Sequence, residues 1–178
     1  MTMIAAISLL GASFIILMPA WAVEVLGGDV TTNGLLNSAR GAGALIGALS
    51  IASLGRFNYR GKLLTIGTFA FPAALLLFSF LRTVPISLVV LTVVGAAMVL
   101  VMNLTNSLIQ TSVSDAMRGR VNGIYSLIFF GFTTIGSLLI GQLAEFTGGP
   151  AALEISSLAL LAMAALVWLF YPRLRSLE

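Results

Sequence analysis

The chain is 178 residues long, and 59% of its residues are hydrophobic while only 8% are charged, whereas a soluble domain carries about 25% charged residues. So few charges cannot cover a water-exposed surface, which excludes an ordinary soluble domain and indicates that lipid is the solvent. Most of the nine Lys and Arg residues lie scattered in short loops and none forms part of a basic patch, so we expect no nucleic-acid partner.

Six apolar segments follow one another along the chain, and each is close to the approximately 20 residues that a membrane-spanning helix needs. They cover residues 3–26, 35–54, 63–81, 86–107, 121–143 and 151–171. Turns rich in Gly, Pro and Asp separate them. Residues 1–4 carry no basic charge, so we expect no cleavable signal peptide and predict that the first segment stays in the membrane. The prediction is an all-α polytopic membrane protein with six transmembrane helices.

Loop charges differ between the two ends of these segments. The second loop, the fourth loop and the tail carry Arg56, Arg60, Lys62, Arg118, Arg120, Arg173 and Arg175. The opposite end has a single basic residue, Arg82. Because Lys and Arg near helix ends stay on the cytoplasmic side, both termini are expected in the cytoplasm.

A stripe of polar residues begins just before the second apolar segment and runs into it. Asn33, Asn37 and Arg40 fall at i, i+4 and i+7, which places them on one helix face, and such a face should meet protein or water. A neighbouring face carries a row of small residues, which allows another helix to approach closely. This row is Ala39, Gly43 and Gly47.

The fourth segment repeats this pattern near its cytoplasmic end. Asn103, Asn106 and Gln110 fall at i, i+3 and i+7, again on one face. Two interpretations of Asn106 and Gln110 stay open: they line a cavity, or they meet the lipid headgroups. The third and sixth segments are almost purely apolar, and we expect them to face lipid.

Arg40 needs an explanation because of its depth. At 1.5 Å per residue it stands about 24 Å above Arg56, in the outer half of the membrane, where a charge costs at least about 2.5 kcal/mol. Three alternatives follow: an ion pair with Glu24 at the end of the first segment, a cavity-facing role toward an anionic group, or snorkelling toward the outer surface.

The loop after the fourth segment reads Gln-Thr-Ser-Val-Ser-Asp-Ala-Met-Arg-Gly-Arg-Val-Asn-Gly over residues 110–123. Its core of Asp115, Arg118, Gly119 and Arg120 resembles a loop of the major facilitator superfamily, in the bacterial exporter-like branch that includes the enterobactin exporter. Ser114 stands where that family usually has a proline. The resemblance makes these four residues gating-loop candidates, since paired guanidinium groups can clasp carbonyls and carboxylates across a loop.

A second loop extends the resemblance. Residues 54–64 resemble the signature between the second and third helices of each half of that superfamily. Gly61 and Lys62 keep its pattern, and the resemblance makes them gating-loop candidates as well. Asn58 stands where the signature has Asp. Residues 14–28 are similar to the seventh helix of the branch, so the resemblance covers essentially the whole chain.

This resemblance implies one six-helix bundle over residues 1–178, the C-terminal half of a twelve-helix fold, with two inverted three-helix repeats at about 1–82 and 85–172. It implies secondary active transport of small molecules, in the direction of efflux, by a multi-pass protein of the bacterial cytoplasmic membrane. The partners would be the lipid bilayer, a small-molecule substrate, and either an N-terminal six-helix half or a second half-size subunit. The cavity and substrate candidates are Asn37, Arg40, Asn103, Asn106 and Gln110.

Two other classes of function compete with transport. The sequence has no Cys and no His, which removes thiolate and imidazole metal ligands and the Ser-His and Cys-His catalytic pairs, so we expect no metal, no cofactor and no enzyme. A non-transporting membrane scaffold or a truncated inactive fragment stays open as the alternative function.

Overall fold

The computed structural model describes the backbone of residues 2–54, 60–111 and 113–170, and the side chains of residues 4–53, 63–111 and 113–169. Its elements are α1 (Thr2–Ala6), η1 (Ile7–Gly11), η2 (Ala12–Leu17), α2 (Met18–Ala20), η3 (Trp21–Val25), α3 (Val30–Leu54), α4 (Arg60–Ser79), α5 (Val84–Thr111), α6 (Asp115–Thr147) and α7 (Gly149–Phe170). The elements from α1 to η3 follow one another directly and form one helical segment, which we call the first span.

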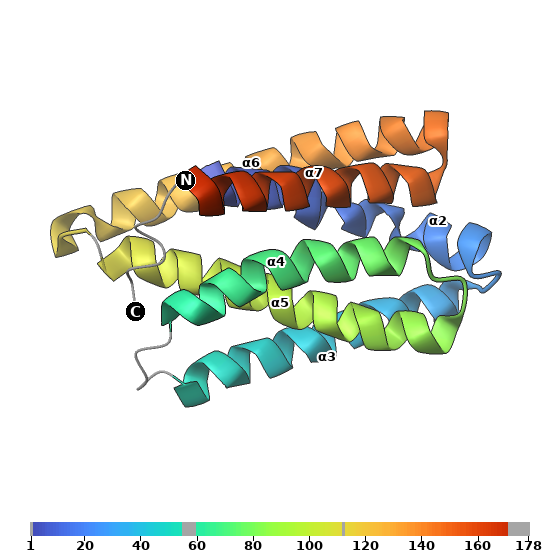
Figure 1. Ribbon diagram of the computed structural model, residues 1–178, viewed down its shortest axis with the longest axis horizontal. Helices are drawn as coiled ribbons and strands as arrows, with labels where there is room; N and C mark the ends of the chain where they lie inside the picture. The colour runs from blue at the N-terminus through green and yellow to red at the C-terminus, as the bar shows by residue number, and fades with distance from the viewer. Residues whose placement is uncertain (1, 55–59, 112, 171–178) are drawn as a thin grey trace.

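The prediction of an all-α membrane protein is confirmed. Five helical segments are long and apolar enough to cross a membrane, and the apolar part of α4, Leu63–Ser79, supplies a shorter sixth. The turns that follow the first span, α4 and α6 lie at one end of the bundle (Figure 1). The turn between α5 and α6 lies at the other end, toward which α1 begins and α7 ends.

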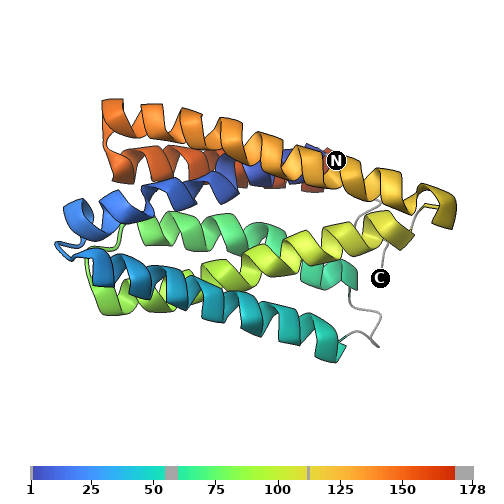
Figure 2. The same cartoon turned by 180° about the vertical axis from the view of Figure 1, so that it is seen from behind.

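The helices form two groups along the length of the bundle. α3, α4 and α5 pack together on one side, and α6 and α7 pack with the first span on the other (Figure 2). α4 also contacts α7 and joins the two groups. The core between them is aromatic: Trp21 of the first span stacks on Phe78 of α4 with ring centroids 4.9 Å apart, and Phe14 and Phe71 are fully buried nearby.

The row of small residues predicted on α3 packs against α5. A side chain at Gly43 would overlap the backbone carbonyl oxygen of Thr92, and a Cβ at Gly47 would lie 2.6 Å from that of Ala96. The contact is reciprocal, because a side chain at Gly95 of α5 would overlap the carbonyl oxygen of Arg40. The two backbones therefore touch, as expected where small residues face each other in a membrane.

The first span is less regular than its sequence predicts. Pro19 leads to the expectation of a simple kink, because it removes one backbone donor. The structure instead has a π-helical turn at η1, a 3₁₀ stretch at η2, a short α-helical piece containing Pro19, and a second π-helical turn at η3. The hydroxyl groups of Ser8 and Ser13 donate to the carbonyl oxygens of Ile4 and Leu9, a side-chain bond that bends helices.

The two nearly pure apolar helices, α4 and α7, are only partly as expected. Each exposes one face, with Ile66 and Leu166 among the exposed residues. Each buries the other face in the core, through Leu75 and Leu153 for example. A helix that is apolar on all faces must have apolar surroundings, but its composition does not show which face contacts lipid and which packs on other helices.

α3 begins five residues before its apolar run. Asp29 caps it: the carboxylate accepts a hydrogen bond from the backbone N–H of Thr32 at 2.9 Å and another from its hydroxyl group at 3.1 Å. These bonds satisfy donors that the first turn of a helix leaves open. Arg40 therefore lies about 15 Å from the start of α3, near the middle of the helix.

Candidate functional site

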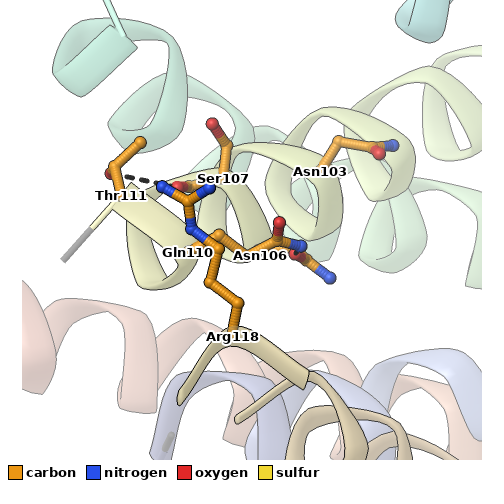
Figure 3. A pocket seen from close by; sticks show the side chains of 6 residues that line it. All are labelled: Asn103, Asn106, Ser107, Gln110, Thr111 and Arg118. Carbon is orange, nitrogen blue, oxygen red and sulfur yellow. Dashed lines mark hydrogen bonds between the residues drawn. The ribbon is translucent and has the colours of Figure 1, made fainter. Parts of the chain in front are cut away.

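A polar hollow lies between the last turns of α5 and the first turns of α6. It has a volume of about 380 Å³, and every residue that lines it has a polar side chain. These residues are Asn103, Asn106, Ser107, Gln110 and Thr111 of α5, and Arg118 of α6 (Figure 3). In a chain that is 59% hydrophobic, such a lining gathers polar groups at one end of the two helices.

Helix geometry explains why one side of the hollow could be predicted. Asn103, Asn106 and Gln110 recur at the spacing of one helix face, and the structure places all three in the lining. The other side comes from the turn between α5 and α6, which reverses the chain and brings Arg118 of α6 over the end of α5 (Figure 3). The hollow is therefore a product of two adjacent helices.

Hydrogen bonds between amides hold the hollow in shape. The amide of Gln110 donates to the side-chain oxygen of Asn106, and Asn106 donates to that of Asn122 on α6 at 3.4 Å. Tyr125 of α6 donates its hydroxyl proton to the carbonyl oxygen of Met102 at 3.1 Å. Two side-chain bonds thus join α5 to α6, and a polar group within lipid strongly requires such partners.

Arg118 has a local ion pair. Its guanidinium group lies 3.0 Å from the carboxylate of Asp115, three residues earlier on the same helix, and both side chains are more than half exposed. An exposed pair of this kind holds the side chain only weakly. The side chain of Arg118 also lines the hollow.

The other gating-loop candidates make fewer contacts. Arg120 is exposed, and it forms no ion pair with any residue in the described part of the chain. A side chain added at Gly119 would meet nothing within 4 Å. The backbone of Gly61 and Lys62 begins α4, and their side chains lie outside the described residues.

Arg40 lies in a second polar group, on α3. Its guanidinium donates to the side-chain oxygen of Asn37 at 3.4 Å. Asn37 in turn donates to the backbone and side-chain oxygens of Asn33, both at 3.1 Å. The stripe predicted from the sequence therefore forms a continuous chain of side-chain bonds along one face of α3.

The proposed ion pair between Arg40 and Glu24 does not form in the described structure. Glu24 lies on the opposite side of the first span, in a separate hollow of about 330 Å³ that also includes Glu145 of α6. The two residues are close in sequence and topology, but the rotation of the π-helical turn η3 decides which neighbour Glu24 meets. The sequence pattern contains no signal for that rotation.

Four residues at the polar hollow are absent from the predicted candidates, two of them in its lining and two that bond α6 to α5 beside it. Ser107 and Thr111 line it beside the predicted amides, and Asn122 and Tyr125 bond to α5 from α6. A signal existed for Asn122, which follows Arg118 at i+4 and so shares its helix face. Tyr125 follows at i+7, again on that face.

Comparison with known proteins gives the family. The transmembrane secretion effector family matches residues 1–178. The multidrug efflux pump Tap of Mycolicibacterium fortuitum is 30% identical over 150 residues, which are 84% of this chain and 36% of that protein. The enterobactin exporter EntS of Citrobacter koseri is 28% identical over 181 residues, covering 97% of this chain and 43% of that protein.

A further relative, the multidrug efflux pump Tap of Mycobacterium bovis (strain BCG), is 29% identical over 136 residues, or 76% of this chain and 32% of that protein. The chain thus spans less than half the length of these curated relatives. No solved structure matches significantly.

Proposed function

We propose a function from a premise that the family match establishes: this chain belongs to the transmembrane secretion effector family of the major facilitator superfamily. It is a multi-pass membrane protein with six apolar helices. The function that we propose is secondary active export of small molecules, with this chain as the C-terminal six-helix half of the exporter. Exporters are prominent among its relatives.

The polar hollow between α5 and α6 carries this proposal. Its lining offers amide, hydroxyl and guanidinium groups at one end of an apolar bundle. Such groups bind and release polar parts of a small molecule without holding it permanently, which a transport pathway requires.

The second half of the exporter would cover α3 and α6. These two spans have only 17% of their residues buried within this chain, against 61% for the first span. In the proposed assembly their open faces meet an N-terminal half or a second half-size subunit, with the substrate near the midplane between the halves. The two inverted repeats at about 1–82 and 85–172 also belong to this proposal.

Coupling would come from an ion gradient. The sequence contains no phosphate-binding loop of the type that hydrolyses ATP. We propose that the two bundles rock around the central site, and that Arg118 and Arg120 stabilise the closed state of the cytoplasmic side. Both termini would then lie in the cytoplasm, in accordance with the loop charges.

Reconstitution into liposomes tests the proposal. The assembled twelve-helix protein should move a fluorescent dye under an imposed proton gradient, while this chain alone should move none, because its α3 and α6 faces lack the second bundle. Gradient-driven transport by a purified homodimer of this chain would show that a second copy takes the place of the N-terminal half. Failure of the assembled protein with every dye would contradict export.

Accessibility of introduced cysteines tests the orientation separately. The natural sequence has no Cys, so single cysteines at Asp29, Arg82 and Ser114 give unambiguous signals. An impermeant thiol reagent added outside cells should label positions 29 and 82 and leave position 114 unlabelled. The reverse pattern would overturn the cytoplasmic placement of the termini.

A further inference from the structure

Arg40 carries a charge in the middle of α3 that no described residue neutralises. Its single side-chain partner is the neutral amide of Asn37, at 3.4 Å. Its Nε atom is buried and has no hydrogen-bond partner. A guanidinium group has five N–H donors, so most of its bonding capacity stays open inside an apolar bundle.

The surroundings of Arg40 do not offer an acid. Glu24 faces the hollow between the first span and α6. Asp29 is exposed at the start of α3, where Thr32 occupies its carboxylate. The helix that packs on Arg40 is α5, which contacts it through the backbone at Gly95 and has no acidic residue between Val84 and Thr111. No acid in the described residues, 4–53, 63–111 and 113–169, therefore serves as its counter-charge.

The side chain of Arg40 is positioned before any partner arrives. Asn37 uses its own amide group to donate to Asn33, at 3.1 Å to each oxygen. This leaves the side-chain oxygen of Asn37 pointing toward Arg40, so the asparagines fix one edge of the guanidinium. A held, half-buried Arg40 is not a side chain that snorkels freely to the surface.

One flank of Arg40 is open. α3 packs on α5 through Gly43 and Gly47, but the residues on the other flank of Arg40 are exposed and small or apolar: Gly41, Leu45 and Ala48. They give contact surface to an apolar body and offer no charge. An incoming molecule would thus meet one fixed cation beside an apolar helix face.

We propose that Arg40, held by Asn37, binds a carboxylate group of the transported molecule. This inference rests on the proposed export function and narrows its substrates to amphipathic anions. The planar fork of a guanidinium matches the two oxygens of a carboxylate. In the membrane interior this pair removes the penalty of an isolated charge, so an anion is preferred over a cation of the same shape.

A matched pair of dyes tests the proposal. Carboxyfluorescein and rhodamine 6G share a xanthene core, but the first carries free carboxylates and the second is a cationic ester. Binding of each dye to the assembled protein in nanodiscs is measured by fluorescence anisotropy. Arg40→Gln should weaken carboxyfluorescein binding by at least about tenfold, as expected for loss of a charge-assisted bidentate bond, and change rhodamine 6G binding by less than about twofold.

Two further variants serve as controls. Arg40→Lys keeps the charge and loses the fork, so it should fall between the wild type and Arg40→Gln. Arg82→Gln removes the same charge from the outer loop, where Arg82 donates to the carbonyl oxygens of Ser79 and Leu81, and should leave the binding of both dyes unchanged.

The outcomes separate this inference from the function on which it rests. Equal carboxyfluorescein affinity in the wild type and Arg40→Gln overturns it. A loss of both dyes together with a lower melting temperature also overturns it, because Arg40 then pairs with an acid of the other half. Arg40-dependent binding of carboxyfluorescein without gradient-driven transport would support the carboxylate site and contradict export.

Discussion

The inner hollow and Arg40 are both polar groups within an apolar bundle, but they are satisfied in different ways. In the hollow, Gln110, Asn106 and Asn122 bond to one another across two helices. On α3, Arg40 has one long bond to a neutral amide and a buried nitrogen without a partner. The amides of the hollow thus find partners within this chain, whereas Arg40 finds no counter-charge among the described residues.

This difference separates a structural requirement from a functional one. A network whose members satisfy each other contributes to stability, and its removal should be seen in unfolding. A charge with no counter-ion in the apolar interior costs free energy instead of contributing to stability. Substitutions in the packing contact, in the hollow and at its rim should therefore lower the free energy of unfolding by decreasing amounts, in that order.

The largest effect is expected at the contact between α3 and α5 that positions Arg40. Gly43→Leu places a side chain into the backbone of Thr92 and should lower the free energy of unfolding by about 3 kcal/mol. Gly34→Ala is the control, because a Cβ at Gly34 meets nothing within 4 Å. Denaturation of the assembled protein in mixed micelles measures both, and equal stability of the two variants would contradict the close packing.

A smaller effect is expected within the hollow. Asn106→Ala removes its bonds to Gln110 and Asn122 and should cost about 1 kcal/mol, since side-chain bonds between membrane helices average about 0.6 kcal/mol each. Asn103→Ala is matched to it. Among the described residues Asn103 bonds to the carbonyl oxygen of Val99 on its own helix, at 3.0 Å, so its loss should cost less. The reverse ranking would show that the amide network does not stabilise the hollow.

At the rim, stability and activity should separate. The Arg118–Asp115 pair is exposed, so Arg118→Ala should change the free energy of unfolding by less than about 0.5 kcal/mol. Turnover of the assembled exporter should nevertheless fall, because the guanidinium borders the hollow. Arg118→Lys keeps the charge that sets topology but loses the planar fork. Wild-type turnover in Arg118→Lys would mean that Arg118 only fixes the orientation of the helices.

The smallest effect is expected at the cap of α3. Hydrogen bonds from the backbone N–H and hydroxyl of Thr32 lower the pKa of Asp29 below its usual value. A carboxyl group with a lowered pKa in the folded state stabilises that state above its unfolded pKa of about 3.9 and loses this contribution as the pH falls through the folded value. In Asp29→Asn, the melting temperature should therefore fall less steeply as the pH drops below about 4 than it does in the wild type. An unchanged steepness, recorded by thermal unfolding between neutral and acid pH, would contradict the cap.

The predictable part of the fold follows from local physics. Six apolar runs with turn residues between them must become helices, because a backbone in lipid has to satisfy its own hydrogen bonds. The amides of α5 line one side of the hollow together, since the spacing of Asn103, Asn106 and Gln110 fixes their common face. The row at Gly43 and Gly47 likewise packs closely, as predicted.

Tertiary structure alone decided which faces meet. Glu24 lines a hollow with Glu145 and forms no ion pair with Arg40 among the described residues, and Tyr125 bonds across to α5. The first span alternates between π, 3₁₀ and α geometry where a single kink at Pro19 was expected. Sequence determined that the chain crosses a membrane and which side chains share a helix face, because both depend on local periodicity. The rotation of each helix and the partner opposite each polar group depend on the packing of all six helices at once, and no local pattern encodes that.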